Sequence, residues 1–212
     1  MGFDRKPDTS MYFITDSTFC GEEEFLRRVE DALRGGVTLL QLREKNKTTR
    51  EYIDLAEKVH ALTVKYNVPL IIDDRIDVAM AAGAEGVHLG QSDMPVATAR
   101  RILGDDIIIG ATTKTVPQAL EAYEQGADYL GVGAIYPTTT KVKTVLTSVE
   151  TLADICRAVP IPVNAIGGLN KDNIDVLKDA DIAGICVVSA IMKADSPYDA
   201  TIELIEAAKE IL

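Results

Sequence analysis

The sequence predicts a single-domain protein of the α/β class, a (β/α)8 TIM barrel. Short runs rich in Val, Ile and Leu alternate with longer amphipathic stretches from one end of the chain to the other. These runs are apolar nearly throughout, which is typical of parallel strands covered on both faces. An open doubly wound sheet is the alternative, but no G-x-G-x-x-G motif follows the first run.

The expected elements follow from this alternation. Strands are predicted at 11–16, 38–44, 69–74, 86–90, 107–112, 129–135, 162–167 and 184–189. Helices are predicted at 22–34, 48–66, 75–82, 95–103, 116–125, 148–158, 170–178 and 197–211. Several helices end in glycine-containing stops just before the next strand, where glycine is a common cap. We expect residues 1–10 to be a frayed leader and residues 11–212 to form the barrel.

The composition excludes some classes of function. The 212 residues carry a net charge of −11 and are 47% hydrophobic, which is typical of a soluble globular protein. An acidic chain disfavours a broad nucleic-acid surface or a membrane-surface role. Cys20, Cys156 and Cys186 form no C-x-x-C pair, so we expect neither a disulfide framework nor a zinc site, and a reducing, cytoplasmic location.

Polar residues follow nearly every predicted strand. Because the carboxyl ends of barrel strands carry the active site, we expect them to surround a polar ligand. They are Gln41, Arg43 and Lys45; Asp73, Asp74 and Arg75; His88, Gln91 and Asp93; Thr112 and Thr113; residues 137–141; Gly167 and Gly168; and Ser189.

Charged residues in this set divide by chemistry. Asp74 and Asp93 are hard oxygen donors on neighbouring strand ends, the kind of pair that binds Mg²⁺ with waters and phosphates. The alternative is that each caps the following helix. Arg43, Lys45 and Lys141 would draw an anionic ligand into the mouth of an acidic protein. The alternative is that they are solvated surface charges.

A second anion site is expected after the last two strands. Gly167 and Gly168 follow one strand and Val188 and Ser189 the other, where barrels commonly bind phosphate through backbone N–H groups. The alternative is a tight turn that needs glycine for its backbone angles. Two anion sites and a divalent cation indicate joining or exchange of two phosphorylated small molecules. No nucleophile with a paired base is evident, and His88 is interpreted as a core or supporting group.

Six motifs occur together and in order. They are QLREK at 41–45, IIDDRIDVA at 71–79, GVHLGQSD at 86–93, PTTTK at 137–141, AIGGL at 165–169 and VVSAI at 187–191. With these motifs the sequence resembles the thiamine-phosphate synthase family from about residue 11 to the end. The resemblance implies a Mg²⁺-dependent transferase of thiamine biosynthesis that joins a pyrimidine diphosphate to a thiazole phosphate and releases pyrophosphate.

The resemblance also implies roles for individual residues. Gln41, Arg43 and Lys45, with the backbone of Leu42 and Glu44 between them, would hold the pyrimidine diphosphate. Lys141 would reach the same group, and Arg43, Lys45 and Lys141 would be catalytic by stabilising the leaving pyrophosphate. Asp74 and Asp93 would hold Mg²⁺. The thiazole phosphate would be held by Thr138, Thr139, Thr140, Gly168, Val188 and Ser189.

Two positions depart from the family's usual pattern. Asp73 stands where the family usually has Asn, and Thr112 where it usually has Ser; both complete the expected substrate-binding set. A thiazole tautomerase of the same superfamily and a non-catalytic thiazole-phosphate-binding protein are the alternatives. The full cation and acid set favours the synthase, and no histidine follows the fifth predicted strand in the sequence, where a proton-shuttling tautomerase would need one.

Overall fold

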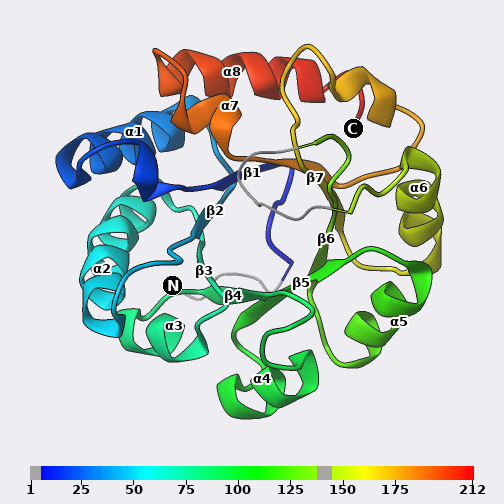
Figure 1. Ribbon diagram of the computed structural model, residues 1–212, viewed down its shortest axis with the longest axis horizontal. Coiled ribbons are helices and arrows are strands. Elements are labelled where there is room, and N and C mark those ends of the chain that lie inside the picture. Colours follow the sequence, from blue (N-terminus) through cyan, green and yellow to red (C-terminus); the bar gives the residue numbers. More distant parts are fainter. Residues whose placement is uncertain (1–5, 138–144) are drawn as a thin grey trace.

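The computed structural model describes residues 6–137 and 145–212, which form a closed barrel of parallel strands. The strands follow one another in chain order from β1 to β8, and β8 pairs with β1, for example Tyr12 with Cys186. Figure 1 shows the helices arranged around this central sheet. The predicted single-domain (β/α)8 barrel is therefore confirmed.

The observed elements lie close to the predicted ones. The strands are β1 (Met11–Ile14), β2 (Leu39–Leu42), β3 (Leu70–Asp73), β4 (Gly86–Leu89), β5 (Ile108–Thr113), β6 (Tyr129–Gly133), β7 (Val163–Ile166) and β8 (Gly184–Val187). The α-helices are α1 (Glu22–Gly35), α2 (Thr49–Tyr66), α3 (Ile76–Ala82), α4 (Val96–Leu103), α5 (Val116–Glu124), α6 (Val149–Ala158), α7 (Ser189–Met192) and α8 (Pro197–Ala208). Two 3₁₀ helices complete the described chain, η1 (Ser17–Phe19) and η2 (Ile174–Leu177).

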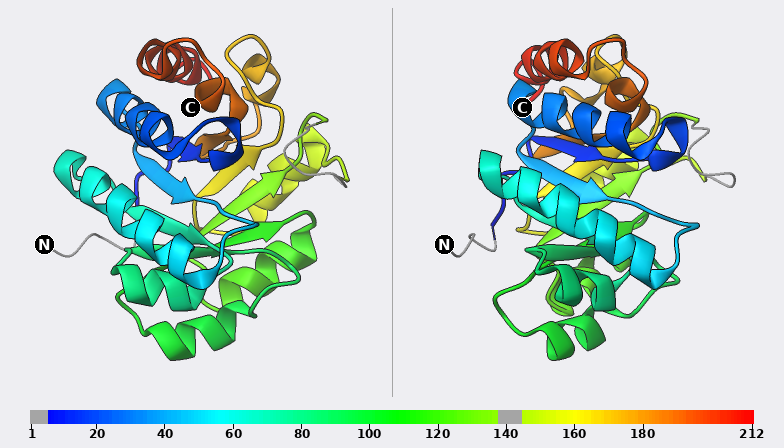
Figure 2. Two further views of the ribbon diagram at one scale, coloured as in Figure 1. Left: turned by 60° about the vertical axis from the view of Figure 1, so that its left-hand side comes forward. Right: turned by 90° about the vertical axis from the view of Figure 1, so that its left-hand side faces the viewer.

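The strands separate two apolar cores. Alternate side chains along a strand point to opposite faces of the sheet. Tyr12, Leu39, Ile71 and Tyr129 belong to a small core inside the barrel. A larger core lies between the strands and the surrounding helices. Figure 2 shows the strand arrows pointing towards one end of the barrel, so polar residues that follow different strands come together there.

The α-helix predicted at 170–178 is wrong. The segment forms only the short η2, because Asn side chains bond to the nearby backbone in place of helical partners. Asn170 Oδ1 accepts from the Asp172 N–H at 2.9 Å, and Asn173 Oδ1 accepts from the Asn170 N–H at 2.8 Å. The short α7 directly after β8 was not expected from the sequence.

Packing begins before residue 11. Pro7 is buried and Thr9 is only 3% exposed, although residues 1–10 were expected to be a frayed leader. The Ser10 carbonyl accepts a hydrogen bond from the Ile185 N–H of β8 at 3.2 Å. The segment just before β1 is therefore part of the packed structure at the amino end of the barrel.

The last helix completes the outer layer. α8 packs along α1, where the Arg34 guanidinium lies 5.2 Å from the centre of the Tyr198 ring. A Cβ on Gly35 would lie 2.7 Å from Thr201 Cβ, so only glycine allows this close approach. None of the helices in the described part of the chain is long and apolar enough to cross a membrane.

Replacing Gly184 should destabilise the barrel. A Cβ there would lie 1.9 Å from the Thr9 carbonyl oxygen, which is backbone and cannot rotate away. We expect Gly184→Ala to lower the free energy of unfolding by about 2 kcal/mol in urea denaturation. Gly21→Ala is the control, because nothing lies within 4 Å of its added Cβ. Equal stability of the two variants would contradict the close packing at Gly184.

Candidate active site

Charged residues after β2 and β3 form an ion-pair cluster. These strands are neighbours in the sheet, so the residues that follow them lie side by side. Lys45 Nζ lies 2.6 Å from Asp73 Oδ2 and also donates a hydrogen bond to Asp74. Arg43 Nε lies 3.7 Å from Asp73 Oδ2. The structure thus brings together the cations and acids that the sequence placed at two separate strand ends.

Asp73 is the buried centre of this cluster. Its side chain is only 9% exposed, and burial, followed by the adjacent Asp74 carboxylate, raises its pKa above the usual value. Lys45 and then Arg43 oppose that rise. Asp73 Oδ2 has no well-aligned hydrogen-bond donor among the described residues, so its contact with Lys45 is chiefly an ion pair. Burial works against the Lys45 charge, but the two carboxylates raise the pKa of Lys45 overall.

Asp74 and Asp93 approach each other across the ends of β3 and β4. Asp74 adopts a left-handed backbone conformation, with φ of 62°, and its N–H donates to the His88 carbonyl at 2.9 Å. Asp93 Oδ2 accepts from the Gly90 N–H at 2.8 Å. Burial and then the Asp74 carboxylate raise the pKa of Asp93. Neither acid caps a helix, because α3 and α4 have other residues at their N-caps.

The loops after β7 and β8 are also adjacent, because these strands pair. Gly167 and Gly168 have φ angles of 105° and 67°, and a Cβ on Gly168 would lie 2.8 Å from Tyr136 Cβ. The glycines therefore meet a backbone requirement whether or not they bind an anion. Asn173 Nδ2 donates to the Gly168 carbonyl at 2.9 Å, which fixes this turn. Beside it, Ser189 begins α7 directly after Val188.

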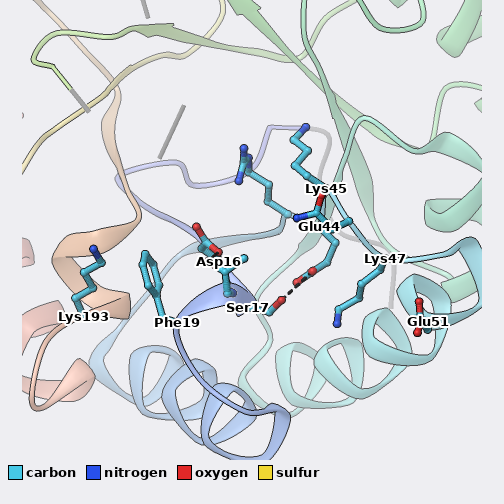
Figure 3. A pocket seen from close by; sticks show the side chains of 11 residues that line it. Asp16, Ser17, Phe19, Glu44, Lys45, Lys47, Glu51 and Lys193 are labelled. Carbon is cyan, nitrogen blue, oxygen red and sulfur yellow. Dashed lines mark hydrogen bonds between the residues drawn. The ribbon is translucent and has the colours of Figure 1, made fainter. Parts of the chain in front are cut away.

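A pocket of about 570 Å³ opens beside Arg43 and Lys45. Figure 3 shows Asp16, Phe19 and Lys193 on its wall, residues that the sequence analysis did not select. Lys193 Nζ lies 4.4 Å from the centre of the Phe19 ring. The sequence did contain an indication of this wall, since Asp16 is the first charged side chain to follow the apolar part of the first predicted strand.

Two of the expected binding residues have structural partners on this side. Glu44 Oε2 accepts from the Ser17 hydroxyl at 2.8 Å, as Figure 3 shows, and burial raises the pKa of Glu44. The Leu42 carbonyl accepts from the Tyr52 hydroxyl at 2.7 Å. The Leu42 carbonyl and the Glu44 side chain are therefore already bonded within the protein.

Gln41 and Thr112 lie at the ends of an interior network of polar side chains. Tyr12, Tyr129 and His88 connect them by hydrogen bonds within the barrel. His88 lies inside the barrel, as expected of a core or supporting group, and its Nε2 is 2.9 Å from Thr112 Oγ1. No histidine follows β5 in the sequence, but His88 of the neighbouring strand β4 lies beside the end of β5. The sequence analysis missed the two tyrosines: alternation along a strand indicates which residues point inward, but it does not show that Tyr12 and Tyr129 meet inside the barrel.

The remaining expected residues are Thr138, Thr139, Thr140 and Lys141, which lie outside the described residues. Among the residues that are described, no group of three or more His, Cys, Asp or Glu side chains is placed to hold a metal. The acidic pair Asp74 and Asp93 is therefore the arrangement in that part of the chain on which a metal proposal rests.

Comparisons with known proteins agree with one another. A family model described as thiamine monophosphate synthase matches residues 11–191. Thiamine-phosphate synthase 2 of Streptococcus pneumoniae is 52% identical over 87% of this chain and 88% of its own length. Thiamine-phosphate synthase of Methanobrevibacter smithii is 47% identical over 95% and 96% of the two chains. The solved thiamine phosphate pyrophosphorylase from Pyrococcus furiosus is 40% identical, with a TM-score of 0.89 over 99% of this chain and 100% of its own.

The Lys45–Asp73 ion pair should contribute to stability. Lys45→Met leaves the buried Asp73 carboxylate without its nearest cation. We expect the free energy of unfolding in urea to fall by about 1–2 kcal/mol, less than for a fully buried pair because the Lys45 side chain is 42% exposed.

The double variant Lys45→Met with Asp73→Asn should recover part of that loss, since the buried side chain at position 73 then carries no charge. Lys58→Met is the control: it breaks an exposed ion pair with Glu22 and should leave stability unchanged. Strict additivity of the two changes at Lys45 and Asp73 would contradict their coupling.

Proposed function

The chain belongs to the thiamine monophosphate synthase family, and we propose that its substrates are 4-amino-2-methyl-5-hydroxymethylpyrimidine diphosphate and 4-methyl-5-(2-phosphoethyl)thiazole. It is a transferase of thiamine biosynthesis with thiamine-phosphate synthase activity. The single structural observation that supports a diphosphate substrate is the cluster of Arg43 and Lys45 with Asp73 and Asp74, beside Asp93, at one mouth of the barrel.

The acidic pair fits a magnesium ion. Asp74 and Asp93 bring two carboxylates together, an arrangement that is unfavourable without a cation, and Lys45 already places a positive charge against Asp74. Mg²⁺ commonly takes one or two carboxylates and completes its shell with waters and substrate phosphate oxygens. When bound, the ion would neutralise charge on the diphosphate. Asp74 and Asp93 are the residues that would hold it.

The protein's part in the reaction is to stabilise the leaving group and align the reactants. The bond between the pyrimidine methylene carbon and the diphosphate oxygen breaks, and its electron pair leaves with pyrophosphate. The thiazole nitrogen supplies the electron pair for the new C–N bond. We assign Arg43, Lys45 and Lys141 the task of contacting the developing negative charge, and the proximity of Arg43 and Lys45 to each other at Asp73 supports this for the first two. No side-chain nucleophile is needed.

The second substrate would be held by its phosphate on the far side of the mouth. The turn at Gly168 and the start of α7 at Val188 and Ser189 offer backbone N–H groups from two neighbouring strand ends. We propose that Thr138, Thr139 and Thr140 complete this site. Holding the thiazole by its phosphate places the ring nitrogen near the methylene carbon and lowers the entropic cost of the encounter.

The other parts of the proposal are simpler. Small molecules are the proposed partners, because the net charge of −11 opposes nucleic-acid binding. We place the enzyme in the cytoplasm, since its cysteines form no disulfide. The tautomerase alternative is disfavoured because both ring nitrogens of His88, the histidine near β5, bond within the barrel.

The deciding experiment mixes the purified protein with both phosphorylated substrates and MgCl₂. Mass spectrometry then follows thiamine phosphate and pyrophosphate, with EDTA as the control. Product that disappears with EDTA supports the substrates and the metal. Binding of the thiazole phosphate without product, or with isomerisation of the thiazole alone, would overturn the proposal in favour of a binding protein or a tautomerase.

Asp93→Ala should lose magnesium-dependent turnover. A metal ion is worth several kcal/mol of transition-state stabilisation, so we expect kcat/KM to fall by about a hundredfold or more. Binding of the thiazole phosphate, measured by calorimetry, should be nearly unchanged. Asp54→Ala, on the exposed side of α2, is the control. Full activity of Asp93→Ala would remove this residue from the metal site.

Asp73→Asn should match or exceed the parent rate. The amide keeps the shape of the side chain, removes a buried negative charge beside the proposed diphosphate site and releases Lys45 from one ion pair. Steady-state kinetics with varied pyrimidine diphosphate checks this. A large drop in kcat would show instead that the Asp73 carboxylate takes part in binding or catalysis.

A further inference from the structure

The interior network crosses the barrel from β2 to β5. Gln41 Nε2 donates to the Tyr12 hydroxyl at 2.5 Å, and that hydroxyl lies 2.6 Å from the Tyr129 hydroxyl. Tyr129 in turn lies 3.1 Å from His88 Nδ1, and His88 Nε2 lies 2.9 Å from Thr112 Oγ1. Gln41 and Thr112 each precede the last residue of their strand, so both ends of the network lie close to the mouth.

The direction of every hydrogen bond follows from the Gln41 amide. The Tyr12 oxygen accepts from Gln41, so its single proton is donated to Tyr129. Tyr129 then donates to His88 Nδ1, which leaves the imidazole proton on Nε2. Nε2 donates to Thr112 Oγ1, so the Thr112 proton is available to a bound molecule. At the other end, the atom of the Gln41 amide that does not bond Tyr12 is its oxygen, an acceptor.

The barrel makes room for this arrangement with two glycines. A Cβ on Gly110 of β5 would lie 2.1 Å from Tyr129 Cζ and 2.5 Å from His88 Nδ1. A Cβ on Gly131 of β6 would lie 3.3 Å from His88 Cε1. The tyrosines also pack edge to face, with ring centres 5.6 Å apart. The network is thus held by packing as well as by hydrogen bonds.

We infer that Tyr12, Tyr129 and His88 are positioning residues that select an aminopyrimidine over an oxopyrimidine, by fixing Gln41 as an acceptor and Thr112 as a donor. A 4-aminopyrimidine carries a donor, its amino group, and an acceptor, a ring nitrogen, on opposite sides of the ring. An acceptor at one end of the network and a donor at the other match that pattern. This inference rests on the proposed function, because it takes the pyrimidine as a substrate.

The test compares two ligands that differ at one group. Calorimetry with MgCl₂ measures the affinity of 4-amino-5-hydroxymethyl-2-methylpyrimidine monophosphate and of its 4-oxo counterpart, in which a carbonyl replaces the amino group. The parent protein should prefer the amino compound by about tenfold or more, because the oxo group would face the Gln41 oxygen. Tyr12→Phe and Tyr129→Phe keep the rings and interrupt the network at different points.

In Tyr12→Phe the Gln41 amide loses its partner and can turn over, so the preference for the amino compound should fall by about tenfold. Tyr129→Phe should reduce it as well, because His88 and Thr112 lose their fixed direction. Tyr66→Phe removes a hydroxyl that bonds Glu30 on the outside of the barrel and is the matched control. A general loss of stability would weaken both ligands alike and leave their ratio unchanged.

The possible outcomes separate the two proposals. A change in the affinity ratio of more than about threefold in Tyr12→Phe, with the control unchanged, supports the inference. A smaller change overturns the positioning role while the proposed function stands. If the parent protein binds neither pyrimidine, the proposed function fails at this substrate and the inference fails with it.

Discussion

Closure of the sheet, in which β8 pairs with β1, is the constraint on which the rest of the structure depends. A closed sheet has one interior, so the inward side chains of distant strands must share it. Apolar residues such as Leu39 and Ile71 fill part of this interior, and Gln41 and Asp73 follow two residues later on the same faces. Along these two strands, the inward-facing side chains therefore change from apolar in the barrel core to polar at the mouth.

Electrostatics at that mouth reflects a balance between folding and binding. Burial raises the pKa of Asp73, and two cations are needed to hold its charge. Lys45 is shared between Asp73 and Asp74, although the proposed reaction needs it on a diphosphate. When the diphosphate and a divalent cation bind, the ion pairs of this cluster would be replaced. The metal would bind the carboxylate of Asp74, and the diphosphate would bind the ammonium group of Lys45. Neighbouring acidic and basic side chains are therefore suited to bind a diphosphate together with the divalent cation that it coordinates.

Sequence patterns predicted the strands, most helices and the grouping of polar residues, because each depends on local periodicity and on one rule about strand ends. They failed where side chains compete with the backbone, as at Asn170 and Asn173 in the segment that forms η2. They also missed Tyr12 and Tyr129, whose hydroxyls meet across 117 residues of sequence. Such a contact depends on the register of the closed barrel, which periodicity within one strand does not contain.

A polar network inside a small barrel must be satisfied at every atom, because each unpaired buried group costs about 1–3 kcal/mol. An apolar interior would be simpler to pack, so stability alone does not account for a chain of hydrogen bonds that joins three hydroxyls, an amide and an imidazole. Such a network also fixes which group donates and which group accepts each hydrogen bond. Each tyrosine hydroxyl accepts one bond and donates its single proton to the next group, so the orientation of the Gln41 amide determines whether Thr112 Oγ1 accepts a bond from His88 or donates one to it. The interior of the barrel is then part of the recognition surface, although none of its tyrosines reaches the mouth.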